Sequence, residues 1–212
     1  LKVGWTASGG QYMTCKDTGP GIPEEEIPIV LASFGQGSNS IKSAEQGAGL
    51  GLPIVMTIGN RAIGAPINIW NDHSDSMSMR DAGWIQLFAE TNQEAADLHI
   101  QAFKLAETLS CPVMVCVDGF ILTHAYERVD IPEQNEVDAY LPPFEPVQVL
   151  DVNEPVSIGA MVGPEAFFEV RYLQHHKQQR ALELIPQLAL EFKLRFGRDS
   201  GGLIQSELLR NS

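Results

Sequence analysis

Two glycine-rich runs near the start of the chain could bring backbone amides close to a phosphate group. They are DTGPGI at residues 17–22 and GAGLG at residues 47–51, with SFGQGS between them at residues 33–38. Glycine lets a backbone N–H approach a phosphate closely, and a carboxylate can accept a hydrogen bond from an adenine amino group. Either run alone would also fit an ordinary turn. Both runs in this order indicate a nucleotide site.

Residues 1–55 resemble the end of the ATP-binding domain of sensor histidine kinases. DTGPGI matches the G1 box of that family, FGQGS matches the F box and GAGLGLPIV matches the G2 box. The resemblance implies that the aspartate meets the adenine, that the first glycines shape the pocket and that the later glycines lie under the phosphates. The cofactor-binding residues expected on this basis are Asp17, Gly19, Gly21, Gly47, Gly49 and Gly51.

The catalytic parts of such a kinase precede the segment that this chain matches. In that family they are the asparagine that holds magnesium and the histidine that accepts the phosphoryl group. Phosphoryl transfer depends on positioning and on metal-assisted stabilisation of charge. We therefore expect at most weak ATP binding from residues 1–55, and no kinase activity.

A second group of polar residues lies in GNRA at residues 59–62 and NDHSD at residues 71–75. A guanidinium such as that of Arg61 offers a fixed fork of donors to a carboxylate. The oxygen and nitrogen atoms of NDHSD could surround a small cation, but consecutive loop residues cannot all point inward, so we expect no metal site. His73 could line a pocket or could hold the loop by hydrogen bonds, and the sequence leaves both alternatives open.

Residues 56–204 resemble the alpha subunit of the pyruvate:ferredoxin oxidoreductase family, which includes other 2-oxoacid:ferredoxin oxidoreductases. Three stretches carry the resemblance: MTIGNRAIGAPINIWNDHSDSMSMRDAGWIQLFAETNQEAADLHIQAFKLAE, PVMVCVDGFILTHAYERVDIP and FGRDSGGLI. The resemblance implies decarboxylation of a 2-oxoacid on thiamine diphosphate, transfer of electrons through iron–sulfur clusters to ferredoxin, and release of an acyl-coenzyme A.

This second resemblance also implies roles for particular residues and partners. Arg61 would pair with the substrate carboxylate, and the loop after it would border the same pocket through Asn71, Asp72, His73 and Asp75. Of these residues, Arg61, Asp72 and His73 are the expected catalytic ones. Thiamine diphosphate would be shared with a beta subunit, and other subunits would pass electrons to ferredoxin. The chain has three cysteines and no C-x-x-C pair, so we expect no iron–sulfur cluster of its own.

The hydrophobic pattern predicts an α/β fold. Residues 92–109 have apolar residues at spacings of three and four, which is typical of an amphipathic helix. The apolar run PVMVCV at residues 112–117 then suits a strand covered on both faces, as in a parallel sheet. APINIW and WIQLFAE are also interpreted as strands, residues 3–16 as a hairpin, and residues 164–196 as a final helical region. The proline-rich connector at residues 130–155 is expected to be irregular.

The two resemblances divide the chain into three parts. Residues 1–55 would be a partial histidine-kinase-type ATPase α/β sandwich, and residues 56–204 a partial thiamine-diphosphate pyrimidine-binding domain. Residues 205–212 would be a tail. A joint near Val55 and Met56 falls inside both expected domains, whereas natural fusions usually join at linkers. We therefore interpret the chain as a chimera.

Three functions remain open: an oxidoreductase fragment that is inactive alone, an ATP-binding module, and an inert fusion. The formal net charge of −13 argues against a nucleic-acid partner, because such binding needs Lys and Arg to neutralise phosphates. No apolar stretch reaches the length of a membrane span and no signal peptide is recognisable, so we expect a cytoplasmic location without membrane contact.

Overall fold

The computed structural model describes two short N-terminal strands and most of the chain from residue 53 onward. The described residues are 2–5, 11–14, 53–146, 149, 151–153 and 162–205. Strands β1 (Lys2–Trp5) and β2 (Gln11–Thr14) pair antiparallel, which confirms the hairpin predicted for this region.

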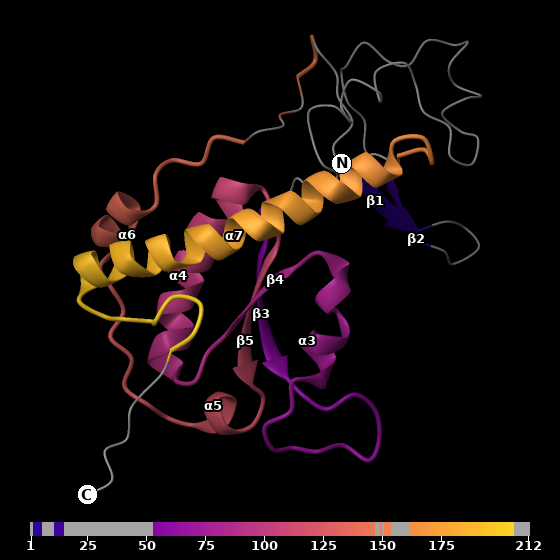
Figure 1. Ribbon diagram of the computed structural model, residues 1–212. Helices are drawn as coiled ribbons and strands as arrows, with labels where there is room; N and C mark the ends of the chain where they lie inside the picture. The colour runs from indigo at the N-terminus through magenta and orange to yellow at the C-terminus, as the bar shows by residue number, and fades with distance from the viewer. Residues whose placement is uncertain are drawn as a thin grey trace, which may run out of the picture.

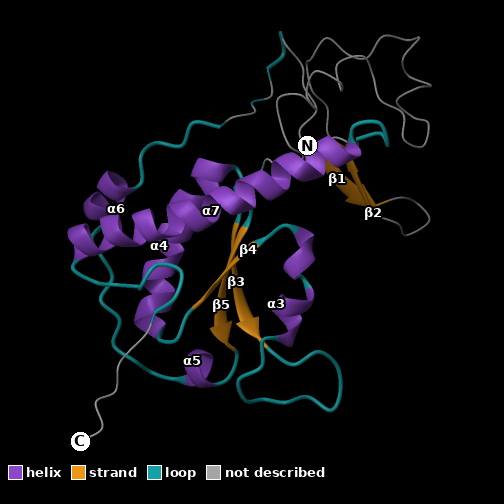
Figure 2. Ribbon diagram, viewed as in Figure 1, coloured by secondary structure: helices purple, strands orange, loops and turns teal. Residues whose placement is uncertain are grey.

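A parallel sheet of three strands forms the centre of the described chain (Figure 1 and Figure 2). The strands lie in the order β3-β5-β4, and their bounds are Val55–Asn60 for β3, Ile85–Phe88 for β4 and Val113–Asp118 for β5. Every residue of β5 is buried, as expected of a central strand with a neighbour at each edge. The parallel sheet confirms the predicted α/β class.

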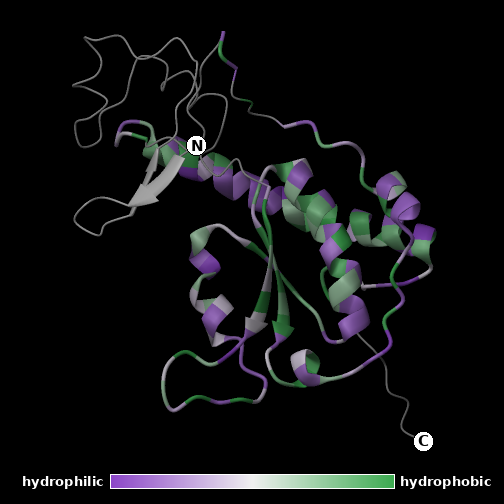
Figure 3. Cartoon of the chain, turned by 180° about the vertical axis from the view of Figure 1, so that it is seen from behind, coloured by the Kyte–Doolittle hydropathy of each residue, from purple (hydrophilic) through white to green (hydrophobic). Residues whose placement is uncertain are grey.

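Helix α4 (Asn92–Leu109) covers one face of this sheet and confirms the helix predicted from periodicity. Its N-terminus is capped by the Thr91 hydroxyl, which accepts a hydrogen bond from the Glu94 amide at 3.1 Å. Its apolar side chains pack on β5, and Figure 3 shows the central strands coloured mostly as hydrophobic. The buried residues of this core are Ile85, Ala102, Leu105, Ala106, Leu109, Cys111, Val113, Val115, Ala181 and Leu188.

Helix α7 (Phe167–Phe196) packs on the outside of α4 and confirms most of the final helical region (Figure 1). It continues through Pro186. Helix α6 (Gln134–Tyr140) joins α7 through the Tyr140 ring, which meets the Phe192 and Phe196 rings edge-on with centroids 5.6 and 5.8 Å away.

Three short elements complete the described fold. Helix α3 (Ser74–Ser78) and the 3₁₀ turn η1 (Arg80–Ala82) lie on the opposite side of the sheet from α4 (Figure 1 and Figure 3). Helix α5 (Ile121–His124) follows the end of β5. None of the helices in the described ranges combines the length and apolarity needed to span a bilayer.

Two expected elements are wrong. Residues 65–70, interpreted as a strand, form an exposed loop, and the strand preceding this loop is β3. A proline in this run removes one of the N–H donors that a sheet needs. The connector expected to be irregular contains α6, whose capping box links the Glu133 and Glu136 side chains to backbone N–H groups.

Candidate functional site

The candidate site lies where strands β3 and β5 end together. Asn60 and Asp118 are the last residues of the two strands and stand opposite each other in the register. Arg61 and Gly119 follow directly, so both segments leave the sheet at its carboxyl edge. Ligands of open parallel α/β sheets bind outside this edge.

A hydrogen-bonded clamp fixes the end of β3. The side-chain amide of Asn60, which is 1% exposed, donates to Asp75 Oδ1 at 2.7 Å and to Ser76 Oγ at 2.8 Å. The backbone N–H of Arg61 donates to the other oxygen of Asp75, Oδ2, at 2.8 Å. The loop after β3 is therefore tied back to the start of α3.

The charge state of Asp75 follows from these contacts. Burial acts to raise the pKa of this carboxyl. Hydrogen bonds from the Asn60 side chain and from the Arg61 and Ser76 backbone, with a smaller contribution from His73, outweigh burial and lower the pKa below its ordinary value. Asp75 is therefore a carboxylate at neutral pH, which suits an acceptor for three N–H groups.

The Arg61 side chain lies against the backbone of Gly119. A Cβ atom at residue 119 would stand 2.7 Å from Arg61 Nε and 2.1 Å from the Asn60 carbonyl oxygen. Gly119 also donates its N–H to that carbonyl at 3.1 Å. Only glycine leaves room for this close approach. No described residue accepts a hydrogen bond from the Arg61 guanidinium or forms an ion pair with it.

The side chains of Asp72 and His73 have contacts of their own, whereas the Arg61 guanidinium has no described acceptor. The Asp72 carboxylate accepts a hydrogen bond from the Ser74 backbone at 2.8 Å, and contacts with the Ser74 side chain and backbone lower its pKa. The His73 ring meets Phe88 edge-on, with centroids 5.1 Å apart, and its buried Nδ1 has no hydrogen-bonding partner among the described residues. The described contacts therefore join Asp75, and not these two residues, to Arg61.

Aromatic side chains lie beside the same edge. The Trp70 ring, 61% exposed, meets Phe120 edge-on at 5.0 Å, and Phe120 lies 5.1 Å from the His124 ring. The Asp118 carboxylate accepts hydrogen bonds from the backbone N–H groups of Phe120 and Ile121 and so fixes the turn into α5.

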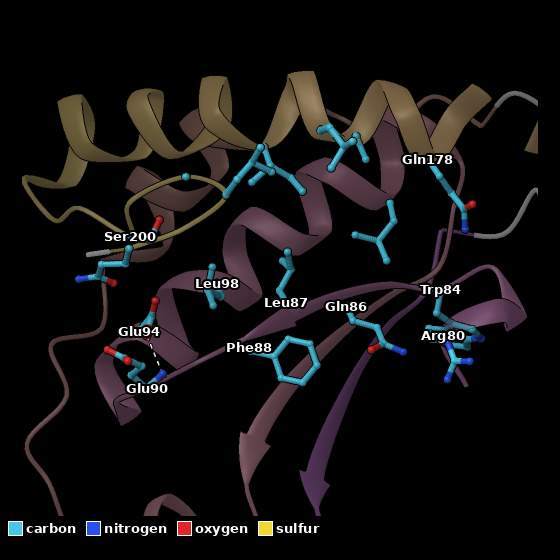
Figure 4. Close-up of a pocket in the computed structure, with 17 residues that line it drawn as sticks. Arg80, Trp84, Gln86, Leu87, Phe88, Glu90, Glu94, Leu98, Gln178 and Ser200 are labelled. Carbon is cyan, nitrogen blue, oxygen red and sulfur yellow. Dashed lines mark hydrogen bonds between the residues drawn. The ribbon is translucent and has the colours of Figure 1, made fainter. Parts of the chain in front are cut away.

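A cavity of about 680 Å³ lies between strand β4 and helix α7, away from this edge (Figure 4). Leu87, Leu182 and Glu94 are among the residues that line it, and Arg61, Asp72 and His73 do not. Glu94 is already engaged, because its Oε2 accepts the Glu90 N–H at 2.6 Å as part of the helix cap. We favour the carboxyl edge over this cavity as the candidate site, because the Arg61 guanidinium at that edge has no hydrogen-bonding or ion-pair partner among the described residues.

The six residues expected to bind ATP lie outside the described residues. They are Asp17, Gly19, Gly21, Gly47, Gly49 and Gly51. Within the described ranges, no group of three or more His, Cys, Asp or Glu side chains could hold a metal ion.

Comparisons with known proteins identify the family. The family model described as pyruvate flavodoxin/ferredoxin oxidoreductase, thiamine diphosphate-binding, matches residues 38–189. The chain belongs to this family. A pyruvate synthase subunit PorA from Methanosarcina barkeri is 48% identical over 164 residues, which make up 76% of this chain and 41% of that relative.

Other relatives lead to the same assignment. A PorA subunit from Pyrococcus horikoshii is 49% identical over 154 residues, which cover 71% of this chain and 39% of the relative. A ketoisovalerate oxidoreductase subunit VorA from Pyrococcus abyssi is 43% identical over 159 residues, which cover 74% of this chain and 40% of the relative. The chain thus spans about two fifths of the length of these relatives.

The family is a thiamine-diphosphate-binding one, and the described residues fit only part of such a site. Asp75 and Asp118 already accept hydrogen bonds from neighbouring N–H groups, and the described chain offers no cluster for the metal that accompanies a diphosphate. The guanidinium of Arg61 has no hydrogen-bonding or ion-pair partner among the described residues and suits an anionic group such as a carboxylate. The edge therefore suits an anionic group, and the residues described there do not supply the free carboxylates that a metal at the diphosphate end of the cofactor would need.

The residues of the clamp were not predicted as a unit. Asn60 and Gly119 carried no role in the sequence interpretation, and Asp75 was expected only to border the pocket. One signal was available: Asn60 and Asp118-Gly119 each end an apolar strand, where parallel sheets gather their functional side chains.

Proposed function

We propose that this chain provides the 2-oxoacid-binding edge of an alpha subunit in a 2-oxoacid:ferredoxin oxidoreductase. The observation that supports this most directly is the Arg61 guanidinium, which stands at the carboxyl edge of the sheet without a described acceptor. The relatives are named as pyruvate synthase and ketoisovalerate oxidoreductase subunits, and pyruvate and ketoisovalerate are both 2-oxoacids.

In this proposal Arg61 holds the carboxylate of the 2-oxoacid by charge-assisted hydrogen bonds and so orients its keto carbon. Asp72 and His73 border the pocket. The Trp70 and Phe120 rings, which meet edge-on beside the same edge, form one side of it. Thiamine diphosphate, when bound, supplies the electron sink that decarboxylation of a 2-oxoacid requires. A beta subunit would share that cofactor, and further subunits would carry electrons to ferredoxin.

A titration of the chain with pyruvate, followed by backbone amide NMR, tests this proposal. We expect saturable shifts at Asn60, Arg61 and Gly119 and weaker shifts with pyruvamide, which carries no charge. Arg61→Ala should weaken pyruvate binding by about tenfold or more, because charge-assisted hydrogen bonds contribute roughly 1.5–3 kcal/mol. Arg128→Ala is the control, since that side chain is 89% exposed. Absence of saturable shifts in the unmodified chain would overturn the proposal.

We also propose that the chain divides into its two parts between residues 55 and 56, although fewer observations support this division than support the 2-oxoacid-binding edge. The division rests on the two resemblances alone, because the family match begins at residue 38 and runs across it. ATP binding by residues 17–51 is a second candidate function, which rests on the resemblance of DTGPGI and GAGLG to the kinase boxes and which the comparisons do not support. Residues 56–204 would form the thiamine-enzyme part and residues 205–212 the tail.

A further inference from the structure

The carboxylate of Asp75 holds two consecutive residues at the end of β3. Its Oδ1 accepts from the Asn60 side chain at 2.7 Å and its Oδ2 from the Arg61 backbone at 2.8 Å. Because one planar group uses a separate oxygen for each neighbour, it fixes the Asn60 side chain and the Arg61 main chain together. Asp75 contacts Arg61 through the backbone nitrogen and forms no ion pair with the guanidinium.

The clamp is itself anchored to the sheet. The Ser76 N–H donates to Asp75 Oδ1 at 2.7 Å, and the Ser76 hydroxyl accepts from Asn60 at 2.8 Å. The Gln86 side chain, on strand β4, donates to the Ser76 carbonyl at 2.8 Å. Ser76 is 3% exposed, so these bonds are shielded from water. The position of Asp75 is therefore set by two strands.

Gly119 limits Arg61 on the other side. The Arg61 Nε atom lies so close to this residue that an added Cβ would stand 2.7 Å away. The main chain of Arg61 is thus held by Asp75 while its side chain crosses the backbone after β5. Together these contacts leave the guanidinium little freedom of direction.

We propose that Asp75 is a positioning residue that directs the Arg61 guanidinium toward the carboxylate of the 2-oxoacid. This inference rests on the proposed function of Arg61. The negative charge of Asp75 is satisfied by N–H groups, so the positive charge of Arg61 remains available to the substrate. A preorganised group binds more tightly because its orientation need not be fixed at the moment of binding.

The test uses the intact chain and two NMR signals. The first is the Arg61 Nε–H resonance, which is assigned by its loss in Arg61→Lys. In the unmodified chain its chemical shift should differ from that of a freely rotating arginine. The second is the pyruvate titration at the Gly119 amide. In Asp75→Asn one acceptor oxygen becomes a donor, so the Arg61 Nε–H resonance should move to the free position. Pyruvate binding should weaken by about tenfold, as small misplacements cause losses of this order.

Matched variants separate positioning from general stability. Asp81→Asn removes a carboxylate that is 89% exposed on η1 and should change neither signal. Asp75→Glu keeps the charge and should restore part of the pyruvate affinity. If Asp75→Asn does not fold, the unmodified chain still decides the matter, because an Arg61 resonance at the free position would contradict the inference.

The outcomes also distinguish this inference from the proposed function. Loss of pyruvate binding in Arg61→Ala, together with unchanged binding in a folded Asp75→Asn, would leave the function standing and exclude Asp75 as a positioning residue. Unchanged binding in Arg61→Ala would exclude both.

Discussion

Tyr140 shows how one buried polar group supports the fold. Its ring is 4% exposed, and its hydroxyl donates to the Leu188 carbonyl on α7 at 3.2 Å. Burial, and to a smaller extent the negative charge of Glu191, raises the pKa of this phenol well above its ordinary value. The neutral form is therefore the one that the folded state favours.

The first prediction concerns pH. Since the folded-state pKa of Tyr140 is raised, the folded chain holds this proton at pH values where the unfolded chain has released it. Its contribution to stability is complete below pH about 10 and is lost as pH rises further. We expect the free energy of unfolding in urea to fall above pH about 10, by at most about 1.4 kcal/mol per unit from this group.

Tyr140→Phe should remove the contribution of Tyr140 to this decrease of the free energy of unfolding with pH. At neutral pH it should also cost about 1 kcal/mol, because the Leu188 carbonyl loses its donor. Tyr126→Phe is the control, since Tyr126 is fully exposed and should leave both the slope and the stability unchanged. Equal slopes for Tyr140→Phe and the unmodified chain would show that the phenol is not held in its neutral form.

At the scale of elements, the packing of α4 on the sheet gives the second prediction. Leu105 is 1% exposed within the core cluster, whereas Leu194 on α7 is 78% exposed. Leu105→Ala should lower the free energy of unfolding by about 3 kcal/mol, because it removes buried methyl groups and leaves a cavity. Leu194→Ala should change it by less than about 0.5 kcal/mol. Urea unfolding of both variants measures the difference.

The third prediction concerns the segment after α7. Arg198 donates two hydrogen bonds to Asp97 on α4, from Nε at 2.7 Å and from a terminal nitrogen at 2.8 Å, and Asp97 is 4% exposed. Asp97→Asn should lower the free energy of unfolding by about 2 kcal/mol, because it breaks a bidentate ion pair in which Asp97 is buried. Arg198 is partly exposed, so the loss should be smaller than for a fully buried pair. The exposed pair of Arg128 and Asp130 supplies the comparison, and Asp130→Asn should cost less than about 1 kcal/mol. Equal losses would show that burial does not strengthen the Arg198 contact.

Elements with a strong apolar pattern could be predicted from the sequence, and those fixed by distant contacts could not. The period of α4 and the continuous apolar run of β5 identified both elements. The run APINIW has apolar residues but pairs with no strand in the described part of the chain, and it forms a loop. Helix α6 is short and lies among prolines. Its start signal was the pair Glu133 and Glu136, three residues apart.

The candidate site was predictable only in part for the same reason. The guanidinium of Arg61 could be identified by its chemistry and by the family resemblance. The partner of its backbone, Asp75, is separated from it by an exposed loop whose path the sequence does not specify. Gly119 reaches Arg61 only because β3 and β5 are neighbours in the sheet, although they are far apart in the sequence.

At the scale of the whole molecule, the proposed 2-oxoacid site and the proposed ATP site would lie on separate segments. We propose the 2-oxoacid, for which pyruvate is the probe, at Arg61, and ATP at the glycine-rich runs of residues 17–51. The family match covers residues 38–189, so the second run falls within the oxidoreductase match while the first precedes it. The two ligands should therefore respond to different substitutions.

The fourth prediction uses this separation. Asp17→Asn should abolish any binding of a fluorescent ATP analogue, because a carboxylate is the expected acceptor for the adenine amino group. It should leave the pyruvate-induced shift of the Gly119 amide unchanged. Arg61→Ala should have the opposite pattern. Fluorescence titration and NMR on the same samples measure both ligands. If Asp17→Asn weakened pyruvate binding as well, the two segments would form one site, and the division at residues 55 and 56 would have to be given up.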